Sequence, residues 1–227
     1  MRALLLEHPD TANRLLVPFV VVLVVVGMLV GIFINDNTTE VVSAILLLIT
    51  SVICRRILDL RRPPGASMFL GPWRIWAFIS LGFMFLAFDE LFSLHEQMDK
   101  KIHAIFQIEE TNLSDRIDDL IILVYGVIGA ILMFAHRSEF RLLTELYKYL
   151  VVGFVFLFLM VLVDAVNNNN EYMELLNIHG AEMQGIAAEV TKDAEELFKL
   201  ISQAIFLFGF LGIFKRFFDI KSGMAHG

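Results

Sequence analysis

Long, uninterrupted apolar blocks limit most strongly what this chain can fold into. Blocks of about 20 residues match the ~30 Å hydrocarbon core of a bilayer. Lipid cannot hydrogen-bond to backbone amides, so such blocks cross a membrane as helices. Hydrophobic residues make up 57% of the chain, against about 45–50% in an ordinary soluble domain. The sequence therefore predicts an all-α fold, a polytopic membrane helical bundle.

Breaks in the apolar pattern divide the chain into about six expected transmembrane helices. The tandem prolines of RRPPG at 61–65 cannot continue a helix, and NNNN at 167–170 ends another apolar block. The first apolar run is too long for a signal peptide and lacks a small-residue cleavage site, so we expect it to be retained. In a single membrane domain, 1–227, the spans fall near 15–35, 38–58, 73–94, 118–136, 148–166 and 196–214, with outer helical segments at 95–117 and 167–195.

Positive charges predict how the spans are oriented. Most of the 18 Lys and Arg residues fall on the side of the membrane that holds both ends of the chain. The positive-inside rule then places both termini in the cytoplasm. Trp73 and Trp76 are expected in the aromatic belt at that inner interface. Most Asp and Glu residues fall on the outer side, an excess that the rule does not explain.

Net charge limits the partners that the chain can have. At −7, the chain lacks the basic surface that nucleic-acid binding requires. The expected partner is the lipid bilayer, with a further copy of the chain or a basic protein docked on the acidic outer face. The expected location is the cell membrane, as a multi-pass protein of a bacterial inner membrane.

Several carboxylates are expected at one depth near the outer boundary of the membrane. Asp89 lies fifteen residues beyond Arg74, or about 22 Å along a helix, and Asp164 lies about 24 Å beyond Lys148. An ionisable side chain inside a span costs at least ~2.5–3.5 kcal/mol, so by default it marks a functional site. Asp89, Glu90 and Asp164 are expected to lie deepest.

Helix geometry suggests which of these groups face one another. On a straight helix Asp89, Ser93 and Glu96 share one face, whereas Glu90 and His95 point elsewhere. Apolar residues at every fourth position from Leu94 predict that the third span continues in line as an amphipathic helix. No single metal ion could then take all of these groups from one straight helix.

Carboxylates and imidazoles gathered from facing helices can bind a metal ion. His95 and Glu96, with Asp99 and His103 one turn further on, suit a divalent cation such as zinc, manganese or iron. The candidate metal ligands are Asp89, Glu90, His95, Glu96, Asp118, Asp119, Asp164, Glu195 and Glu196.

An ordinary structural interpretation stands beside the metal site. Asp115, Asp118 and Asp119 suit the first turn of a helix through the helix dipole. Glu195 and Lys199 have the i, i+4 spacing of a surface pair worth a few tenths of a kcal/mol.

The stretch FLAFDELFSLHE carries a motif: Asp89-Glu90, four residues, then His95-Glu96 at the end of a span. This stretch resembles a group of uncharacterised bacterial multi-pass membrane proteins. Their last span is similar to AEELFKLISQAIFLFGFL, which begins with the acidic pair Glu195 and Glu196. The resemblance implies a shared site built from these residues, and it brings no activity.

Three functions follow from the sequence. The first is a carboxylate/His site at the outer leaflet that binds a divalent cation and serves a metal-dependent enzyme, for example one acting on lipid. The second is a proton- or cation-coupled transporter, since carboxylates at one depth are what a proton relay needs. The third is a non-catalytic subunit of a membrane complex.

Overall fold

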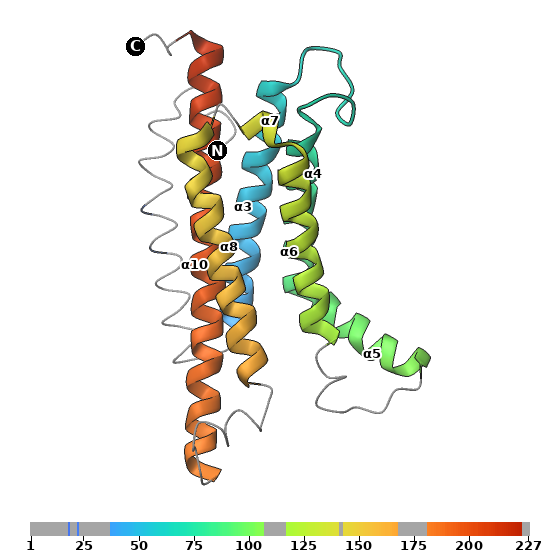
Figure 1. The fold of residues 1–227 in the computed structure, drawn as a ribbon, viewed down its shortest axis with the longest axis vertical. Helices are drawn as coiled ribbons and strands as arrows, with labels where there is room; N and C mark the ends of the chain where they lie inside the picture. The colour runs from blue at the N-terminus through green and yellow to red at the C-terminus, as the bar shows by residue number, and fades with distance from the viewer. Residues whose placement is uncertain are drawn as a thin grey trace.

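The computed structural model is an all-helical bundle in the residues that it describes, which are 37–106, 117–140, 143–167 and 181–223 with isolated positions 18 and 22 (Figure 1). The helices of this part are α3 (Asn37–Arg61), α4 (Arg74–Phe92), α5 (Leu94–Phe106), α6 (Ile117–Ala135), α7 (Arg137–Phe140), α8 (Thr144–Asn167) and α10 (Ala181–Ser222). The prediction of an all-α bundle is therefore confirmed.

Three of the described helices are long and apolar enough to cross a membrane. They are α3, α4 and α10, with apolar stretches at Thr38–Arg61, Arg74–Phe92 and Glu189–Ser222. Helices α6 and α8 carry shorter apolar stretches, Leu120–Ala135 and Tyr147–Val163. The expected first span, 15–35, lies outside the described residues.

The bundle is a row of closely packed helices with one looser member. Helix α10 packs along α8 and α3, and α3 packs along α4, whereas α6 meets α4, α5 and α8 more sparsely. In Figure 1 α10 runs the full height of the molecule, and α6 stands apart from α8. The apolar core is accordingly concentrated where α3, α4 and α10 meet, around Ile53, Trp76, Leu207 and Phe210.

Small polar side chains connect α3 to both of its neighbours. The Ser51 hydroxyl donates to the Ser80 carbonyl (2.7 Å), and the Ser80 hydroxyl donates back to the Ser51 carbonyl (2.9 Å). Gln203 of α10 donates from Nε2 to the Ser43 hydroxyl at 2.6 Å. Such interhelical hydrogen bonds, averaging about 0.6 kcal/mol each, fix the position of one apolar helix against the next.

A glycine notch sets the contact between α8 and α10. A Cβ atom added at Gly153 would lie 2.7 Å from the Phe206 ring, so the ring occupies the space that a side chain would take. Phe206 also packs edge-on against Phe154 and Phe83, with ring centroids 5.1 and 6.0 Å away. One aromatic ring of α10 thus contacts both α8 and α4.

A buried ion pair joins three elements at the upper end in Figure 1, which we call the Glu139 end. Arg61 of α3 donates from Nε and Nη2 to the two oxygens of Glu139 in α7, at 3.1 and 2.9 Å. Trp76 of α4 donates to the same carboxylate at 3.4 Å. Arg61 also lies over the Phe217 ring of α10, 4.8 Å from its centroid. Glu139 was not among the residues that the sequence pattern singled out.

Trp76 is not part of an interfacial belt. Its side chain is fully buried, and its ring packs against Phe140, Phe217 and Phe210 at centroid distances of 5.3, 5.9 and 6.4 Å. The expectation for Trp76 was therefore wrong. Its indole N–H reaches a buried carboxylate rather than the membrane surface, which satisfies the ring's one donor.

The periodicity predicted that the third span continues in line as one helix. The structure shows instead that the helix ends and a new one begins. Ser93 adopts the left-handed conformation (φ 46°, ψ 51°) and ends α4, and α5 starts at the next residue. Figure 1 shows α5 running sideways from the lower end of the bundle, which we call the Asp89 end. The helix expected beyond the span exists, but it takes a new direction because left-handed residues end helices.

The last span, by contrast, has no break at its start. Helix α10 is continuous for 42 residues, about 63 Å at 1.5 Å per residue. From Ala181 onward, the segment expected outside the membrane and the expected span at 196–214 form a single helix.

We predict that Glu139→Gln lowers the free energy of unfolding in detergent by about 3 kcal/mol. This is the low end for breaking a buried ion pair, because the Arg61 side chain remains 32% exposed. The matched control is Asp59→Asn, which removes exposed pairs with Arg55 and Arg62 and should cost under ~1 kcal/mol. Equal effects of the two substitutions, in a denaturant titration, would contradict this role for Glu139.

We predict that Gly153→Ala destabilises the protein by about 1–2 kcal/mol, because the Phe206 ring must leave its position. Gly129→Ala is the control, since a Cβ there meets nothing within 4 Å and alanine favours a helix over glycine by up to ~1 kcal/mol. Thermal unfolding of both variants measures the difference. A Gly153→Ala protein as stable as Gly129→Ala would show that the notch is dispensable.

Candidate functional site

Asp89 and His95 form a hydrogen-bonded pair where α4 ends and α5 begins. The His95 backbone N–H donates to Asp89 Oδ1 at 2.9 Å, and His95 Nδ1 lies 2.9 Å from Asp89 Oδ2. Asp89 is buried, with 5% of its surface exposed. Both oxygens of one buried carboxylate are thus engaged by a single histidine.

The left-handed Ser93 creates this pair. It turns the chain sideways, so that the first turn of α5 presents an amide to the carboxylate of Asp89. Amides in the first turn of a helix have no partner within the helix, and a carboxylate there is favoured by the helix dipole. The expectation that His95 points away from Asp89 was therefore wrong, because it assumed a straight helix.

Lys199 forms ion pairs with two carboxylates, one on α4 and one on its own helix, α10. Its Nζ lies 2.8 Å from Glu90 Oε1 on α4 and 2.8 Å from Glu196 Oε1 on α10. The three side chains are only 14%, 16% and 23% exposed. Glu196 Oε2 is buried without a hydrogen-bond partner in the described part of the chain. The interpretation of Lys199 as a member of a surface pair was wrong.

A lysine at this position changes the chemistry of the acidic layer. An ammonium group within hydrogen-bond distance of Glu90 and Glu196 occupies the place that a cation between them would take, and it neutralises one of their two negative charges. The lysine lies in the run LFKLISQAIFL, which contains no other charged residue. A lone cation in such a run must find an anionic partner, and this was the signal in the sequence for its role.

Of the remaining candidate metal ligands, the structure describes the side chain of one and only the helical position of the other four. Glu195 is half-buried in α10. Asp118 and Asp119 stand in the first turn of α6, Asp164 stands in the last turn of α8, and Glu96 stands in α5, but the side chains of these four lie outside the described residues. Among the described residues, no group of three or more His, Cys, Asp and Glu is arranged to hold a metal ion.

A second His–Asp pair lies further along α5. His103 Nδ1 is 3.0 Å from Asp99 Oδ1 and 3.1 Å from the Asp99 carbonyl, and both side chains are largely buried. These two residues form a pair of their own in α5. The structure records no contact between this pair and Asp89 or Lys199 among the residues that it describes.

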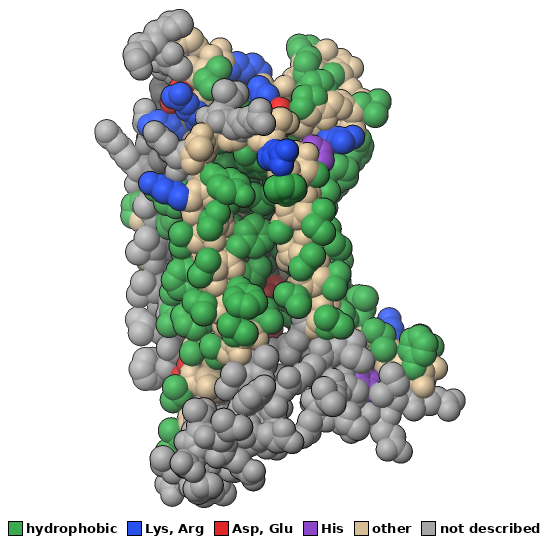
Figure 2. All heavy atoms as spheres, in the orientation of Figure 1, with side chains coloured by type: hydrophobic (Ala, Val, Ile, Leu, Met, Phe, Trp, Pro, Cys, Tyr) green, Lys and Arg blue, Asp and Glu red, His purple; other side chains and the backbone are tan. Residues whose placement is uncertain are grey.

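An apolar cavity of about 280 Å³ lies between α4, α6, α8 and α10. Its wall includes aromatic rings such as Phe85, Tyr125 and Phe206, and the glycines Gly82 and Gly129. A Cβ atom added at either glycine would meet nothing within 4 Å. Figure 2 shows the molecular surface hollowed between the columns of hydrophobic side chains of α8 and α6, with an acidic side chain visible in the hollow.

The charged residues lie on the faces of α4 and α10 that line this cavity. Asp89 follows the lining residues Leu86, Phe85 and Gly82 by three, four and seven positions. Lys199 precedes Phe206 by seven positions. Residues at these spacings share one face of a helix, so the ionisable groups lie at the Asp89 end of the cavity wall.

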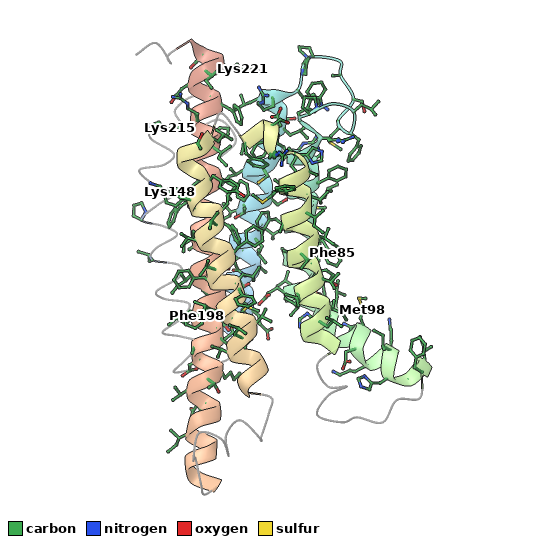
Figure 3. All side chains as sticks on the ribbon, viewed as in Figure 1. Phe85, Met98, Lys148, Phe198, Lys215 and Lys221 are labelled. Carbon is green, nitrogen blue, oxygen red and sulfur yellow. The ribbon has the colours of Figure 1, made fainter. Side chains whose placement is uncertain are left out.

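Tyr125 links the cavity to Asp89 and α5. Its ring packs edge-on against Phe85, with centroids 5.3 Å apart, and its hydroxyl donates to Met98 Sδ at 3.9 Å. It lies within electrostatic range of the Asp89 carboxylate. In Figure 3 Phe85 lies midway along the bundle, and Met98 lies where α5 leaves it. The cavity and the Asp89–His95 pair are therefore adjacent.

The chain belongs to the family described as Domain of unknown function (DUF8692), whose family model matches residues 41–213. The matched region includes α4, α5, α6 and α8, and it ends within α10 beyond Lys199. No curated protein and no solved structure matches the chain.

We predict that Lys199→Met destabilises the protein by about 3–5 kcal/mol, because it leaves two buried carboxylates without their counter-ion. The double variant Lys199→Met/Glu90→Gln should recover part of this loss, since one of the two repelling charges is gone. Lys221→Met, at an exposed position of α10, is the control for the loss of a lysine. A Lys199→Met protein that unfolds like the Lys221→Met protein would disprove this prediction.

Proposed function

We propose that the chain is a six-span protein of the bacterial inner membrane, with the Glu139 end in the cytoplasm and the Asp89 end at the outer leaflet. Three membrane-length apolar helices support this arrangement, together with the shorter apolar stretches of α6 and α8. Lys148, Lys215 and Lys221 lie toward the Glu139 end (Figure 3), as the positive-inside rule requires of a cytoplasmic side.

We propose that the Asp89–His95 pair is a general acid–base site at that outer leaflet. The observation that carries the proposal is the engagement of both oxygens of the buried Asp89 by His95. An ionised carboxylate only accepts hydrogen bonds, so it selects the imidazole tautomer protonated on Nδ1. The neutral ring then carries its lone pair on Nε2, where it can take a proton from a hydroxyl or a water molecule.

The chemistry assigned to His95 needs a fixed imidazole, and the fold supplies one. Asp89 orients the ring and stabilises the imidazolium that forms when Nε2 takes a proton, as the carboxylate does in other carboxylate–histidine pairs. The reaction class is proton transfer coupled to the cleavage or transfer of a group on a membrane substrate. Asp89 is a positioning residue here, and His95 is the group that meets the substrate.

Divalent-cation binding remains a second candidate, in a narrower form. A carboxylate that holds a histidine ring is also a common outer partner of metal-binding histidines. His95 Nε2 would then be the metal ligand, with Asp89 behind it, and further ligands would come from Glu96, Asp118, Asp119 or Asp164. Zinc, manganese and iron all suit such donors.

Transport is less well supported by the contacts in the described core. Two pairs of polar groups between the two ends of the bundle, Ser51 with Ser80 and Ser43 with Gln203, bond to one another across helices, and Thr50 bonds to the backbone of its own helix. A carrier needs polar groups that lead from one side to the other. This arrangement favours chemistry at the Asp89 end, with the carrier and the non-catalytic subunit as alternatives.

The proposal is tested with purified full-length protein in liposomes of a total bacterial lipid extract. We expect the lipid profile, followed by mass spectrometry over time, to show one species consumed and one formed. His95→Gln should slow this conversion by about 10²–10⁴-fold, the usual contribution of a general acid or base. Asp89→Asn should also slow the conversion, because His95 stays in place but is no longer held in the tautomer protonated on Nδ1.

His136→Gln serves as the matched control, because His136 lies at the Glu139 end, bonded to Arg74. Its conversion rate should equal that of the unsubstituted protein. Unchanged conversion in His95→Gln would disprove the acid–base role. A conversion that is abolished by chelation and restored by one added metal would assign His95 to the second candidate instead.

A further inference from the structure

We infer that the cavity between α4, α6, α8 and α10 binds the hydrocarbon chain of a lipid whose ammonium-bearing headgroup meets the charged residues at the Asp89 end. This inference rests on the proposed function and names the substrate class of the same site. Three observations support it: the size of the cavity, the position of the charged residues at its Asp89 end, and the net charge of those residues.

The size and lining of the cavity suit a chain of methylene groups. At about 280 Å³, it is nearly twice the ~150 Å³ of an engineered apolar cavity that stays dry and binds benzene. It can therefore take about a dozen carbon atoms. Aromatic and aliphatic side chains line most of it, and Gly82, Gly126 and Gly129 leave its wall without side chains at three points.

Access to this cavity is from the side. Helix α6 packs sparsely on its neighbours, and Figure 2 shows the hollow between α8 and α6 on an outer face covered by hydrophobic side chains. In a membrane that face meets lipid chains, so a chain can enter without crossing a polar region. An empty apolar volume open to lipid would be filled by lipid, because voids forfeit dispersion contacts.

The charge balance at the Asp89 end selects the headgroup. Asp89, Glu90 and Glu196 carry three negative charges against one positive charge on Lys199. The balance stays negative even when His95 is protonated. A negative site with low exposure attracts an ammonium group and repels a headgroup whose only charge is an anionic phosphate. An amine-bearing lipid such as phosphatidylethanolamine fits both ends of the site.

The test uses phosphatidylethanolamine and phosphatidylglycerol that carry the same photoreactive acyl chain, each in nanodiscs with the full chain. We expect the ethanolamine lipid to cross-link to cavity-lining residues of α4, α6 and α10, and to do so several-fold more than the glycerol lipid. The variants Gly82→Leu and Gly129→Leu place a side chain in the cavity where a Cβ meets nothing. They should lower this cross-linking by about tenfold, or ~1.4 kcal/mol.

Gly185→Leu is the matched control, because Gly185 is an exposed glycine of α10 with nothing within 4 Å of an added Cβ. Its cross-linking should equal that of the unsubstituted protein. Cross-links confined to outward-facing residues such as Ile131 and Phe134, and unchanged by Gly129→Leu, would overturn the inference. So would a lack of lipid labelling in the cavity, which would leave the cavity to another occupant such as residues 15–35 or a second copy. Equal labelling by the two lipids would overturn the headgroup assignment.

The two proposals fail in different ways. Cavity cross-linking does not need His95, so His95→Gln should label like the unsubstituted protein even where lipid conversion is lost. Labelling without conversion in the unsubstituted protein would retain the lipid site and remove the acid–base role. Conversion without cavity labelling would retain the role of His95 and remove the chain-binding cavity.

Discussion

A charged group inside an apolar bundle must have a partner, and this requirement organises both ends of the molecule. At one end Glu139 is held by Arg61 and Trp76. At the other, Lys199 sits between Glu90 and Glu196. Breaking a buried pair costs more than forming it gains, so each pairing restricts which helices can meet. Helices α3, α4, α7 and α10 are brought into place by these contacts as much as by their apolar faces.

Between the two ends, packing density is uneven, and the difference has a physical cause. Where glycine faces a large ring, as Gly153 faces Phe206, the helices close tightly. Where glycine faces open space, as at Gly82 and Gly129, the helices leave a cavity beside α6. The same residue type thus produces a tight contact in one place and a void in another, and its neighbour decides which. The void lies beside the Asp89–His95 pair, which gives the Asp89 end both a polar and an apolar part.

The sequence predicted the helices well and their mutual contacts poorly. Apolar length located α3, α4 and α10, because the bilayer sets the length of a span. Periodicity could not reveal the left-handed Ser93, since serine carries no strong signal for that conformation, and the pairing of His95 with Asp89 followed from it. Lys199 has a neighbour in sequence, Glu196, as one partner, but its other partner, Glu90, lies 109 residues away, and Glu139 lies 78 residues from Arg61. No local pattern encodes such contacts, so they had to come from the structure.

The unbroken course of α10 ties the two ends of the bundle together mechanically. Lys199 and Phe217 are eighteen residues apart on this helix, which is five full turns and about 27 Å. They therefore project from the same side, one toward Glu90 and the other toward Arg61. A rotation of α10 about its own axis would move Lys199 away from Glu90 and Phe217 away from Arg61 in the same direction. A twist applied at the Glu139 end would therefore also displace Lys199 at the Asp89 end.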